Sequence, residues 1–569
     1  MAAKIERVCK LTRKPFFISQ SEVDAYASFQ LPLPDLCPEE RHRRLLAFRN
    51  ERKFFIRTCN ETNQKIFSTF APNVPFPVVA LPYWWNGEWD ALRFGREFDF
   101  TRNFFEQLYD LWKVVPRPAC SILDVTEARA VQNVVDAKHC FLVFDSYHVD
   151  HCYYSVATWD SSRSVDGYLL YSCNYCYECV DCLDCSYLRW SQHCISCTDS
   201  WFLFNCKDCK NCLFCANLEG KEYYVFNKEV SKEEYQQILE SWTFTRRQRV
   251  EEAQSRFSEF IKSHPVPHIY TDNFQGQTGN YIYRCSDVIQ SFESKDCTSI
   301  KHCSSLTRAH DCLDGHGFGD GLRHAAQFVS VGRDAHNLIN CVECWNSVSN
   351  LTYCGYCEKS SNLFGCIGLR NKQFCVFNKQ YSEKEYHLLV KKITEYMKSE
   401  QIWGAFFPPI FSGYAYNHSS AFDRMPLSKV QADLMQFVWD DVDDVQKPSD
   451  LIKVLSGESG AHIGDVPSRL EDIEPGKIGS TVYLCEITGK LFQYTREEIE
   501  FYRMVGVAPP VRCFEQRHSE RLSRLSPRFL NMRKVDPSGR EVETAFSGSW
   551  RQTVMSYEDW RLEVEENSR

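Results

Sequence analysis

Several features that would place a protein in a broad class are missing from this sequence. No apolar run approaches the ~18 residues that a membrane-spanning helix needs, and the opening MAAKIERVCKLTRK has no apolar core of the export type. Low-complexity tracts and charged tails are missing, and so are phosphate loops, cofactor fingerprints and nucleophile–base pairs. We therefore expect a folded, cytoplasmic, non-enzymatic protein that contacts no membrane and has no assigned small-molecule substrate.

Cysteine, in contrast, is abundant. The 569 residues include 29 cysteines, while the hydrophobic content of 43% and the charged content of 25% are ordinary for folded domains. A chain of this length predicts several domains. Because the cytosol keeps thiols reduced, we expect free thiols or metal ligands and not disulfides.

The cysteines follow a period of three. All thirteen between Cys140 and Cys215 share one frame, whose other positions hold mainly serine, threonine, glycine and leucine. This period matches neither an α-helix nor a flat strand, but it fits a β-solenoid in which short rungs point every third side chain inward. A small, readily buried thiol suits such stacking. Rungs of twelve and of twenty-one residues both agree with the spacing.

Zinc binding is the alternative interpretation, and zinc is the one cofactor that the cysteines suggest. Two Cys-x-x-Cys pairs can supply the four thiolates of a tetrahedral site. Cys341 and Cys344 fall outside the frame of their neighbours, so a regular column does not account for them. The two sets with suitable spacing are Cys194, Cys197, Cys206, Cys209 and the better candidate Cys341, Cys344, Cys354, Cys357.

Two internal repeats organise the chain. Residues 217–235 match residues 368–386 at an offset of 151, and in both copies a Val-Phe-Asn-Lys strand precedes a helix capped by Ser231 or Ser382. The chain ends match at an offset of 476, and each contains a short helix for which we expect a cap at Ser21 or Thr495. The end repeat pairs Cys9 with Cys485, Glu22 with Glu498, Tyr26 with Tyr502, and Arg41-His42 with Arg517-His518.

These patterns predict a mainly β protein with α-helices. Two cysteine-lined β-solenoid segments, each followed by a capped helix, are flanked by duplicated, degenerate zinc-ribbon-like α+β modules. The connector before the last module contains a short helix near residues 428–438. The predicted segments are the N-terminal module and aromatic linker (1–118), the first solenoid (119–230), a capping helix (231–265), the second solenoid (266–381), a helix with an aromatic and acidic connector (382–470), and the C-terminal module (471–569).

Two stretches, residues 41–57 and 512–534, are strongly basic although the net charge is −9. One interpretation is a charged face paired with acidic neighbours. The other is contact with RNA or with a phosphate-bearing partner. The candidate contacts are Arg41, Arg43, Arg44, Arg517, Arg521 and Arg524.

Two further clusters allow a functional and a structural interpretation. Acids and histidines in residues 310–324 could hold a metal or act as acid and base, although the glycines between them indicate turns. Four aromatic residues near residue 85 could bind a ligand or pack the N-terminal module against the solenoid. The clusters are His310, Asp311, Asp314, His316, Asp320, His324 and Tyr83, Trp84, Trp85, Trp89.

Several strings resemble a known family: RRLLAFRNERKFFIRTC, WDALRFGREFDFTRNFFEQL, VFNKEVSKEEY and CEITGKLFQYTREEIEFYR. They are similar to the large cysteine-rich repeat proteins that are frequent in bacteria of the candidate phyla radiation. The resemblance covers nearly the whole chain and implies a double zinc ribbon at each end, with Cys-x-x-Cys at each knuckle, but no activity. Here the second cysteine of each knuckle is gone, since Thr12 follows Cys9 and Thr488 follows Cys485, and Ala80 and Tyr83 stand where the last knuckle of the N-terminal module is expected, so the four-ligand site is incomplete.

The sequence therefore predicts an intracellular scaffold or interaction protein that presents rigid solenoid faces. Its partner would be a protein or ribonucleoprotein assembly, or further copies of the same chain. A zinc-binding structural or storage protein and a β-helix glycan-cleaving enzyme are the alternatives.

Overall fold

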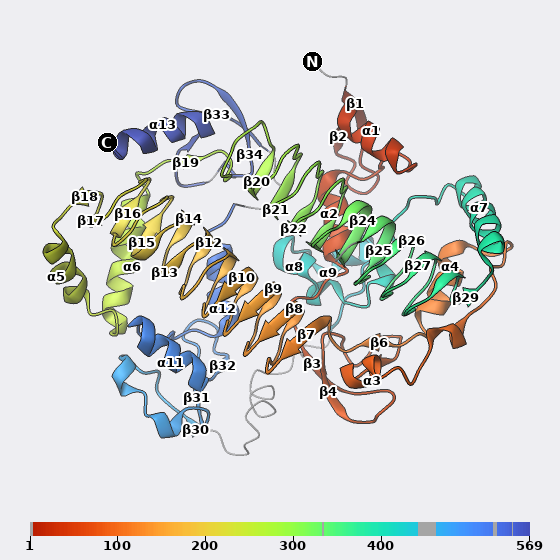
Figure 1. Cartoon of the computed structure of the whole chain (residues 1–569), viewed down its shortest axis with the longest axis horizontal. Helices are drawn as coiled ribbons and strands as arrows, with labels where there is room; N and C mark the ends of the chain where they lie inside the picture. Colours follow the sequence, from red (N-terminus) through yellow and green to blue (C-terminus); the bar gives the residue numbers. More distant parts are fainter. Residues whose placement is uncertain (1–3, 333–334, 442–461, 527–531, 549) are drawn as a thin grey trace. The chain divides into compact units, whose positions relative to one another are not determined.

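The computed structural model describes residues 4–332, 335–441, 462–526, 532–548 and 550–569. Within them the chain combines α-helices with two large, mainly parallel sheets (Figure 1). It forms two compact units: unit 1 holds residues 1–121 and 271–443, and unit 2 holds residues 122–270, 444–527 and 532–569. None of the described helices is long and apolar enough to cross a membrane.

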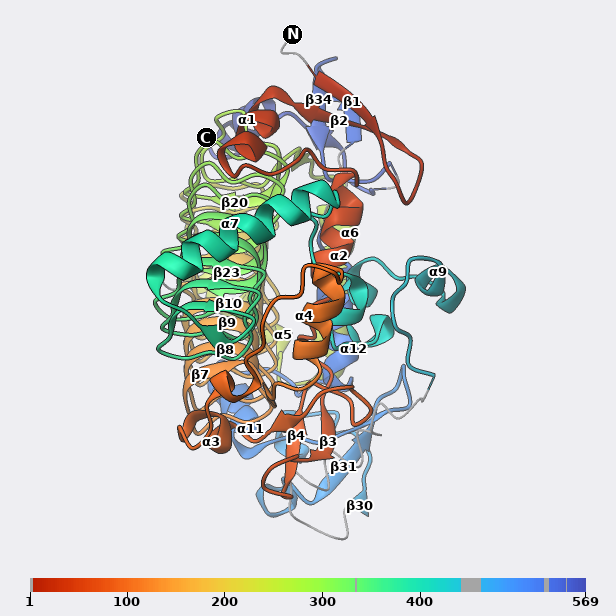
Figure 2. The same cartoon turned by 90° about the vertical axis from the view of Figure 1, so that its right-hand side faces the viewer.

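The large sheet of unit 2 is a stack of short strands that pair in parallel (Figure 2). Partners lie twelve residues apart, as in Val156 with Tyr168 and Cys182 with Cys194, so the chain advances by one strand spacing of ~4.8 Å per twelve-residue coil. The strands are β7 (Ile122–Thr126), β8 (Gln132–Lys138), β9 (Phe144–Asp150), β10 (Val156–Ser162), β11 (Tyr168–Tyr171), β12 (Val180–Leu183), β13 (Ser186–Arg189), β14 (Gln192–Ile195), β15 (Thr198–Phe204), β16 (Leu213–Ala216), β17 (Tyr224–Val225) and β18 (Lys228–Glu229).

The sheet of unit 1 is built in the same way but contains three longer coils. The pairing offset is thirteen residues from β23 to β26, as in His316 with Val329 and His336 with Ser349, and it returns to twelve at Ser349 with Ser361. Each of the three longer coils contains one extra residue, and after the third extra residue the inward positions are again in the original frame of three. The strands are β20 (Gly279–Tyr283), β21 (Ser291–Lys295), β22 (Ser304–Thr307), β23 (His316–Gly319), β24 (Arg323–Gly332), β25 (His336–Val342), β26 (Ser349–Thr352), β27 (Ser361–Phe364), β28 (Gln373–Val376) and β29 (Lys379–Gln380).

The period of three originates in the backbone. From Asp124 to Asn217 every third residue has a φ between 45° and 56°, which is the left-handed conformation. The residue after each one points into the core, as Cys173 does after Ser172. One such bend every three residues gives four bends per twelve-residue coil. Aspartate, asparagine and histidine, which adopt this conformation more readily than most residues, are frequent in the frame.

Each stack ends in a tight turn and a helix. The prediction of one Val-Phe-Asn-Lys strand is wrong, because Phe226 and Asn227 both have positive φ and reverse the chain between β17 and β18. Phe377 and Asn378 do the same between β28 and β29. The predicted capped helices follow, since the side chains of Ser231 and Ser382 accept hydrogen bonds at the starts of α5 and α7. The closing helices are α5 (Lys232–Trp242), α6 (Arg247–Ile261) and α7 (Glu383–Ser399).

The two chain ends fold into equivalent modules, each with a hairpin followed by two helices. Ser19, and not the predicted Ser21, caps the first helix with Glu22, because Ser19 is the counterpart of Thr495, which caps with Glu498. The N-terminal module contains β1 (Lys4–Val8), β2 (Pro15–Ser19), α1 (Gln20–Ser28), α2 (Pro38–Leu46), β3 (Phe55–Thr58) and β4 (Lys65–Ser68). The C-terminal module contains β31 (Thr481–Leu484), β32 (Leu491–Phe492), α11 (Arg496–Val505), α12 (Phe514–Leu522), β33 (Met532–Val535) and β34 (Glu541–Thr544).

Shorter elements complete the two units. The predicted helix near residues 428–438 is α9 (Lys429–Leu434), which Ser428 caps. The unit boundaries at residues 121 and 270 lie close to residues 119 and 266, where the two predicted solenoid segments begin. The remaining elements are β5 (Val78–Val79), α3 (Leu81–Trp85), η1 (Ala91–Phe94), α4 (Phe104–Trp112), β6 (Arg117–Pro118), β19 (Val266–Pro267), η2 (Pro409–Phe411), η3 (Tyr416–His418), α8 (Ser420–Arg424), β30 (His462–Ile463), η4 (Leu470–Asp472), η5 (Pro475–Lys477), β35 (Val554–Met555) and α13 (Tyr557–Asn567).

Candidate functional site

The cysteines of the first stack form its core. Each one from Cys140 to Cys215 has an exposed fraction of 2% or less. The thiols point at backbone carbonyls: Cys206 Sγ lies 3.4 Å from the carbonyl oxygen of Phe204 and 3.6 Å from that of Cys215. Most thiols of the frame repeat these two contacts, with the carbonyls two residues earlier and nine residues later. A protonated thiol donates there and a thiolate cannot, so the surroundings favour the neutral form.

Burial raises the pKa of most core thiols in the two stacks, whereas hydrogen bonds from neighbouring thiols lower those of Cys176, Cys209 and Cys357. Burial raises the pKa of Cys140 and of Cys303 to about 12, and it holds those of Cys185 and Cys194 well above the usual range, because a buried thiolate loses its hydration. At pH 7 a thiol with a pKa of about 12 is ionised to only ~10⁻⁵. Since the thiolate is the nucleophilic form, the thiols whose pKa is raised this far react poorly at neutral pH.

The predicted zinc ligands Cys341, Cys344, Cys354 and Cys357 belong to the same kind of core. All four are fully buried. The longer coils set Cys341 beside Cys354 and Cys344 beside Cys357, as the flanking bridges between residues 342 and 355 and between 345 and 358 show. Their departure from the frame therefore results from the inserted residues. No three of the four sulfurs lie within 4.8 Å of one another, and the same holds for the set from Cys194 to Cys209.

The knuckle cysteines of the terminal modules are buried as well. Cys9 and Cys37 share a small apolar core with Phe16. In the C-terminal module the hydroxyl of Thr488 lies 3.5 Å from the sulfur of Cys513. Threonine thus stands where the second thiol of a knuckle would be, and its hydroxyl contacts a remaining sulfur.

Arg41, a predicted phosphate contact, is part of a buried network in unit 1. Its guanidinium lies 2.9 Å from Asp314 and 3.7 Å from Glu22, while the hydroxyl of Tyr26 donates to Asp314 over 2.6 Å. Glu22 also contacts His302 Nε2 at 2.5 Å. Desolvation favours the neutral carboxyl, but the contact with His302 and the charge of Arg41 outweigh it and lower the pKa of Glu22 to about 2. The network fixes α1 and α2 on the sheet.

The C-terminal module docks on the sheet of unit 2 with the equivalent arginine. Arg517 pairs with Asp166, and Arg521 Nη1 lies 2.8 Å from Asp166 Oδ1 and 2.9 Å from Glu178 Oε1. Arg524 adds a contact of 3.0 Å to the other oxygen of Glu178. Arg521 and Asp166 are completely buried. Asp166 precedes Asp314 by 148 positions, which is the offset of the inner repeat before the three insertions.

Glu498 takes the place of Glu22 in this second network, in a different electrostatic setting. It accepts hydrogen bonds from Tyr154 and from Tyr502, the latter over 3.1 Å. Tyr154 occupies the position that His302 holds in unit 1, so a neutral phenol replaces an imidazole. Burial raises the pKa of Glu498 to about 7, although the charge of Arg517 opposes the shift.

These contacts correct the assignment of Arg41, Arg517 and Arg521 to nucleic acid. Their exposed fractions are 4%, 5% and 0%, and carboxylates of the same unit neutralise them, so external phosphates cannot reach them. The acidic pairing that the first interpretation expects is present for these three, but they are buried and do not form a solvated face. The rest are also occupied: Arg43 binds Glu40 and Tyr416, Arg44 lies 5.8 Å from the ring of Phe406, and Arg524 binds Glu178, while Arg528 of the second basic stretch lies outside the described residues.

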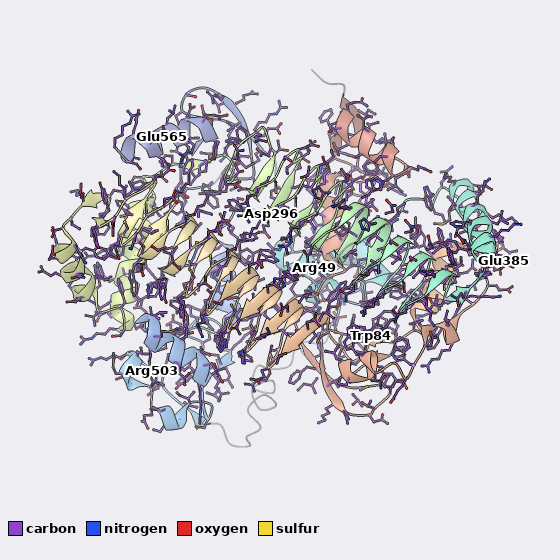
Figure 3. All side chains as sticks on the ribbon, viewed as in Figure 1. Arg49, Trp84, Asp296, Glu385, Arg503 and Glu565 are labelled. Carbon is purple, nitrogen blue, oxygen red and sulfur yellow. The ribbon has the colours of Figure 1, made fainter. Side chains whose placement is uncertain are left out.

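The acids and histidines of residues 310–324 have separate structural roles. His316 is completely buried, and burial together with the charges of Arg49 and Arg424 holds its pKa well below the usual range. Arg49 itself is 1% exposed and is labelled in Figure 3. A buried neutral imidazole cannot meet a polysaccharide. Asp314 belongs to the Arg41 network, Asp320 accepts from Arg308 over 2.8 Å, and His324 stacks on Phe29 at 4.3 Å.

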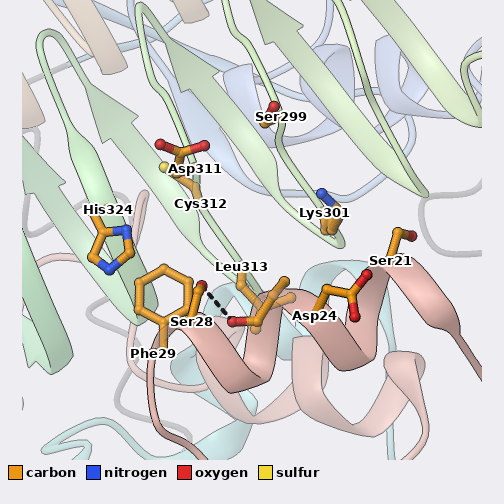
Figure 4. A pocket seen from close by; sticks show the side chains of 11 residues that line it. Ser21, Asp24, Ser28, Phe29, Ser299, Lys301, Asp311, Cys312, Leu313 and His324 are labelled. Atoms are coloured by element: carbon orange, nitrogen blue, oxygen red, sulfur yellow. Dashed lines mark hydrogen bonds between the residues drawn. The ribbon is translucent and has the colours of Figure 1, made fainter.

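A cavity of about 420 Å³ lies beside α1 in unit 1 (Figure 4). Asp24 and Asp311 face it together with Lys301 and His324, and Leu313 contributes an apolar wall. The hydrogen bond drawn there, from the Ser28 hydroxyl to the carbonyl of Ala25 over 2.8 Å, is internal to α1. The cavity offers charges of both signs and no arrangement of nucleophile and base.

The aromatic cluster packs against the sheet of unit 1. The guanidinium of Arg370 lies 4.3 Å from the ring of Trp84, 4.9 Å from that of Trp85 and 5.5 Å from that of Trp89. Trp84, labelled in Figure 3, is 1% exposed. The cluster therefore joins the N-terminal module to the sheet, as one of the two interpretations predicts.

No protein-family model matches this sequence, and no curated protein matches it. The docking residues that sequence reasoning missed are the carboxylates Asp166 and Glu178, while Asp314 was named only as a member of a possible catalytic or metal cluster and not as the partner of Arg41. A comparison of acidic positions between the two cysteine-rich tracts, at the offset of 148 before the insertions, would have paired Asp166 with Asp314.

Proposed function

We propose that this protein is a non-enzymatic scaffold made of two β-solenoids, each covered by a zinc-ribbon-like module. The parallel pairing at twelve residues and the buried thiols support the solenoid assignment. The four strings that resemble the cysteine-rich proteins of the candidate phyla radiation support kinship with that family. Since the predicted zinc ligands Cys341, Cys344, Cys354 and Cys357 are buried in the core, we infer that these cysteines serve the fold and that the outer faces serve the partner.

The observation that carries this proposal is an exposed column of unit 2 formed by Arg163, Tyr175 and Tyr187, which we term the tyrosine ladder. The two tyrosine rings stack at 4.6 Å with an angle of 5°, and Arg163 Nη1 donates to the hydroxyl of Tyr175 over 2.7 Å. Tyr187 is 39% exposed. Tyrosine and arginine dominate the binding energy of protein interfaces, so three of them in one column fit a protein partner.

The backbone holds the tyrosine ladder rigidly. The N–H of Tyr175 donates to the carbonyl of Ser162 over 3.2 Å, and that of Tyr187 to the carbonyl of Asn174 over 3.0 Å. Both side chains leave the coil from left-handed residues whose φ is 54° and 53°. Binding to this surface costs little conformational entropy, because hydrogen bonds to the preceding coil already fix the backbone of both tyrosines in the free protein. A rigid, preordered face is what a scaffold offers.

The test places a photo-crosslinking residue at Tyr187 in the cells that make the protein. The matched control carries it at Asn337, which is exposed and also lies in a ladder, with Asn350 at 3.3 Å, but has no aromatic neighbours in it. We expect one discrete protein adduct at Tyr187, lost in the variant Tyr175→Ser, and none at Asn337. Adducts equal at both positions, or an adduct that nuclease removes, would contradict a protein partner at this face.

A further inference from the structure

Two histidines and an aspartate meet at the ends of two adjacent strands in unit 2. His139 directly follows β8, and Asp150 and His151 end and follow β9. The strands pair in parallel with Lys138 opposite Asp150, so their carboxyl ends lie at the same edge. His139 and His151 are one coil apart and have left-handed φ values of 52° and 51°. Their side chains therefore leave the coil in the same direction.

The three side chains are already close together. Asp150 Oδ1 lies 3.1 Å from His139 Nδ1 and 2.9 Å from His151 Nδ1, and the imidazole rings stack at 4.4 Å. One ligand atom can be chosen from each of the three residues so that all three atoms lie within 4.8 Å of one another. Among the described residues no other group of three histidine, cysteine or acidic side chains meets this distance.

The charge of the group is suited to a cation. Asp150 places a carboxylate oxygen between the two imidazoles, 3.1 Å from His139 Nδ1 and 2.9 Å from His151 Nδ1. Glu127 Oε2 lies 3.5 Å from the second ring nitrogen of His139. Whichever nitrogen of His139 binds an ion, the other remains beside a carboxylate, and such contacts orient metal-binding imidazoles.

The neighbouring Arg163 points its guanidinium at Tyr175 and not at the three ligand side chains. Arg163 is the next residue of the column, and its guanidinium donates to the hydroxyl of Tyr175. The side chains of His139, Asp150 and His151 are 42%, 46% and 37% exposed, so water can complete the coordination of a bound ion. Two imidazoles and one carboxylate suit zinc, nickel, cobalt or copper, whereas calcium and magnesium require more oxygen ligands.

We propose that His139, Asp150 and His151 form a surface site for a divalent first-row transition-metal ion with open coordination positions. The site contains none of the buried cysteines. It also lies at the start of the column that continues into the tyrosine ladder, so a bound ion would add a fixed positive charge to the same face.

The experiment uses the full chain, reduced and freed of metal, titrated with cobalt(II) while heat and absorption are recorded. The wild type should bind one equivalent whose spectrum lacks thiolate-to-cobalt charge transfer. The double variant H139A/H151A should bind this equivalent at least tenfold more weakly.

The matched control is H148A. His148 is 41% exposed, one bend of the coil before His151, and lies between Asp136 at 3.3 Å and Asp160 at 3.2 Å, but it belongs to no group of three ligands. Its loss should leave cobalt binding within twofold of the wild type. Absence of binding by the wild type, equal binding by H139A/H151A, an equal loss in H148A, or a thiolate band at the first equivalent would each overturn the proposal.

Discussion

The buried network that docks the C-terminal module makes a strong prediction for Asp166→Asn. Asp166 is completely buried and neutralises Arg517 and Arg521, and an asparagine keeps the shape while removing the charge. Breaking a buried ion pair on one side costs about 3–5 kcal/mol. Glu178 still neutralises part of the charge of Arg521 at 2.9 Å, so we expect the lower end of that range, about 3 kcal/mol.

The assay is urea unfolding followed by hydrogen exchange, which assigns each transition to a unit. With an m-value of about 3 kcal/mol/M, a loss of about 3 kcal/mol lowers the midpoint of unit 2 by roughly 1 M. Asp314→Asn is the equivalent change in unit 1, because Asp314 binds Arg41 at 2.9 Å. It should lower the midpoint of unit 1 by a similar amount and leave unit 2 unchanged.

Asp296→Asn is the matched control. Asp296, labelled in Figure 3, pairs with Arg284 at 2.7 Å, but the two side chains are 31% and 41% exposed. Exposed pairs of this kind contribute below about 1 kcal/mol, so the midpoint should move by less than about 0.3 M. Equal shifts of the urea midpoint for Asp166→Asn and Asp296→Asn would show that the ion pairs of Arg517 and Arg521 with Asp166 do not stabilise the docking of the C-terminal module.

Further predictions concern pH and the core thiols. The pKa of Glu22 is about 2 in the folded chain, below the ~4.3 of an unfolded glutamate, so unit 1 should lose roughly 2 kcal/mol as the pH falls from 4.5 to 2, and Glu22→Gln should remove this contribution in urea titrations. Glu498 should show the opposite pH dependence, because its pKa of about 7 in the folded chain lies above the unfolded value. Its contribution to the stability of unit 2 is complete below pH ~4.3 and is lost as the pH rises through 7. A stability of unit 2 that does not change with pH, or a Glu498→Gln variant with the same pH dependence as the wild type, would contradict this. Cys194→Ser should cost only about 1 kcal/mol in urea unfolding, because Ser191 and Ser200 already occupy the same frame and donate to carbonyls at 3.1 and 2.7 Å, whereas removal of a zinc ligand would cost far more.

The sequence predicted what depends on local pattern. The period of three in the cysteine tract identified the inward positions, and all thirteen cysteines from Cys140 to Cys215 are buried. The caps at Ser231, Ser382 and Thr495 followed from serine or threonine placed three residues before a glutamate. The cap at Ser19 was missed because Ser21 also precedes acidic residues, and the offset of 476 to Thr495 was not applied to it.

Pairing over long distances was beyond the sequence. The twelve-residue coil depends on left-handed backbone at every third position, and the composition of that frame, which includes tyrosine and phenylalanine beside aspartate, does not reveal it. The partner of Arg517 is 351 residues away, so a basic stretch looked like a binding face until its carboxylates were located. The shift of Cys341 and Cys344 out of the frame, which two added residues before them cause and a third after them reverses, likewise resembled a metal motif until the strand register was known.

The central claim is that buried, neutral thiols stabilise both stacks without metal. It is tested most directly by thermal unfolding of the reduced chain before and after exhaustive treatment with a strong chelator. The account predicts melting temperatures that agree within about 2 °C, because the buried thiols bind nothing that a chelator can remove. A fall of 10 °C or more, reversed by one or more equivalents of zinc, would show that the cysteines are ligands and would contradict it.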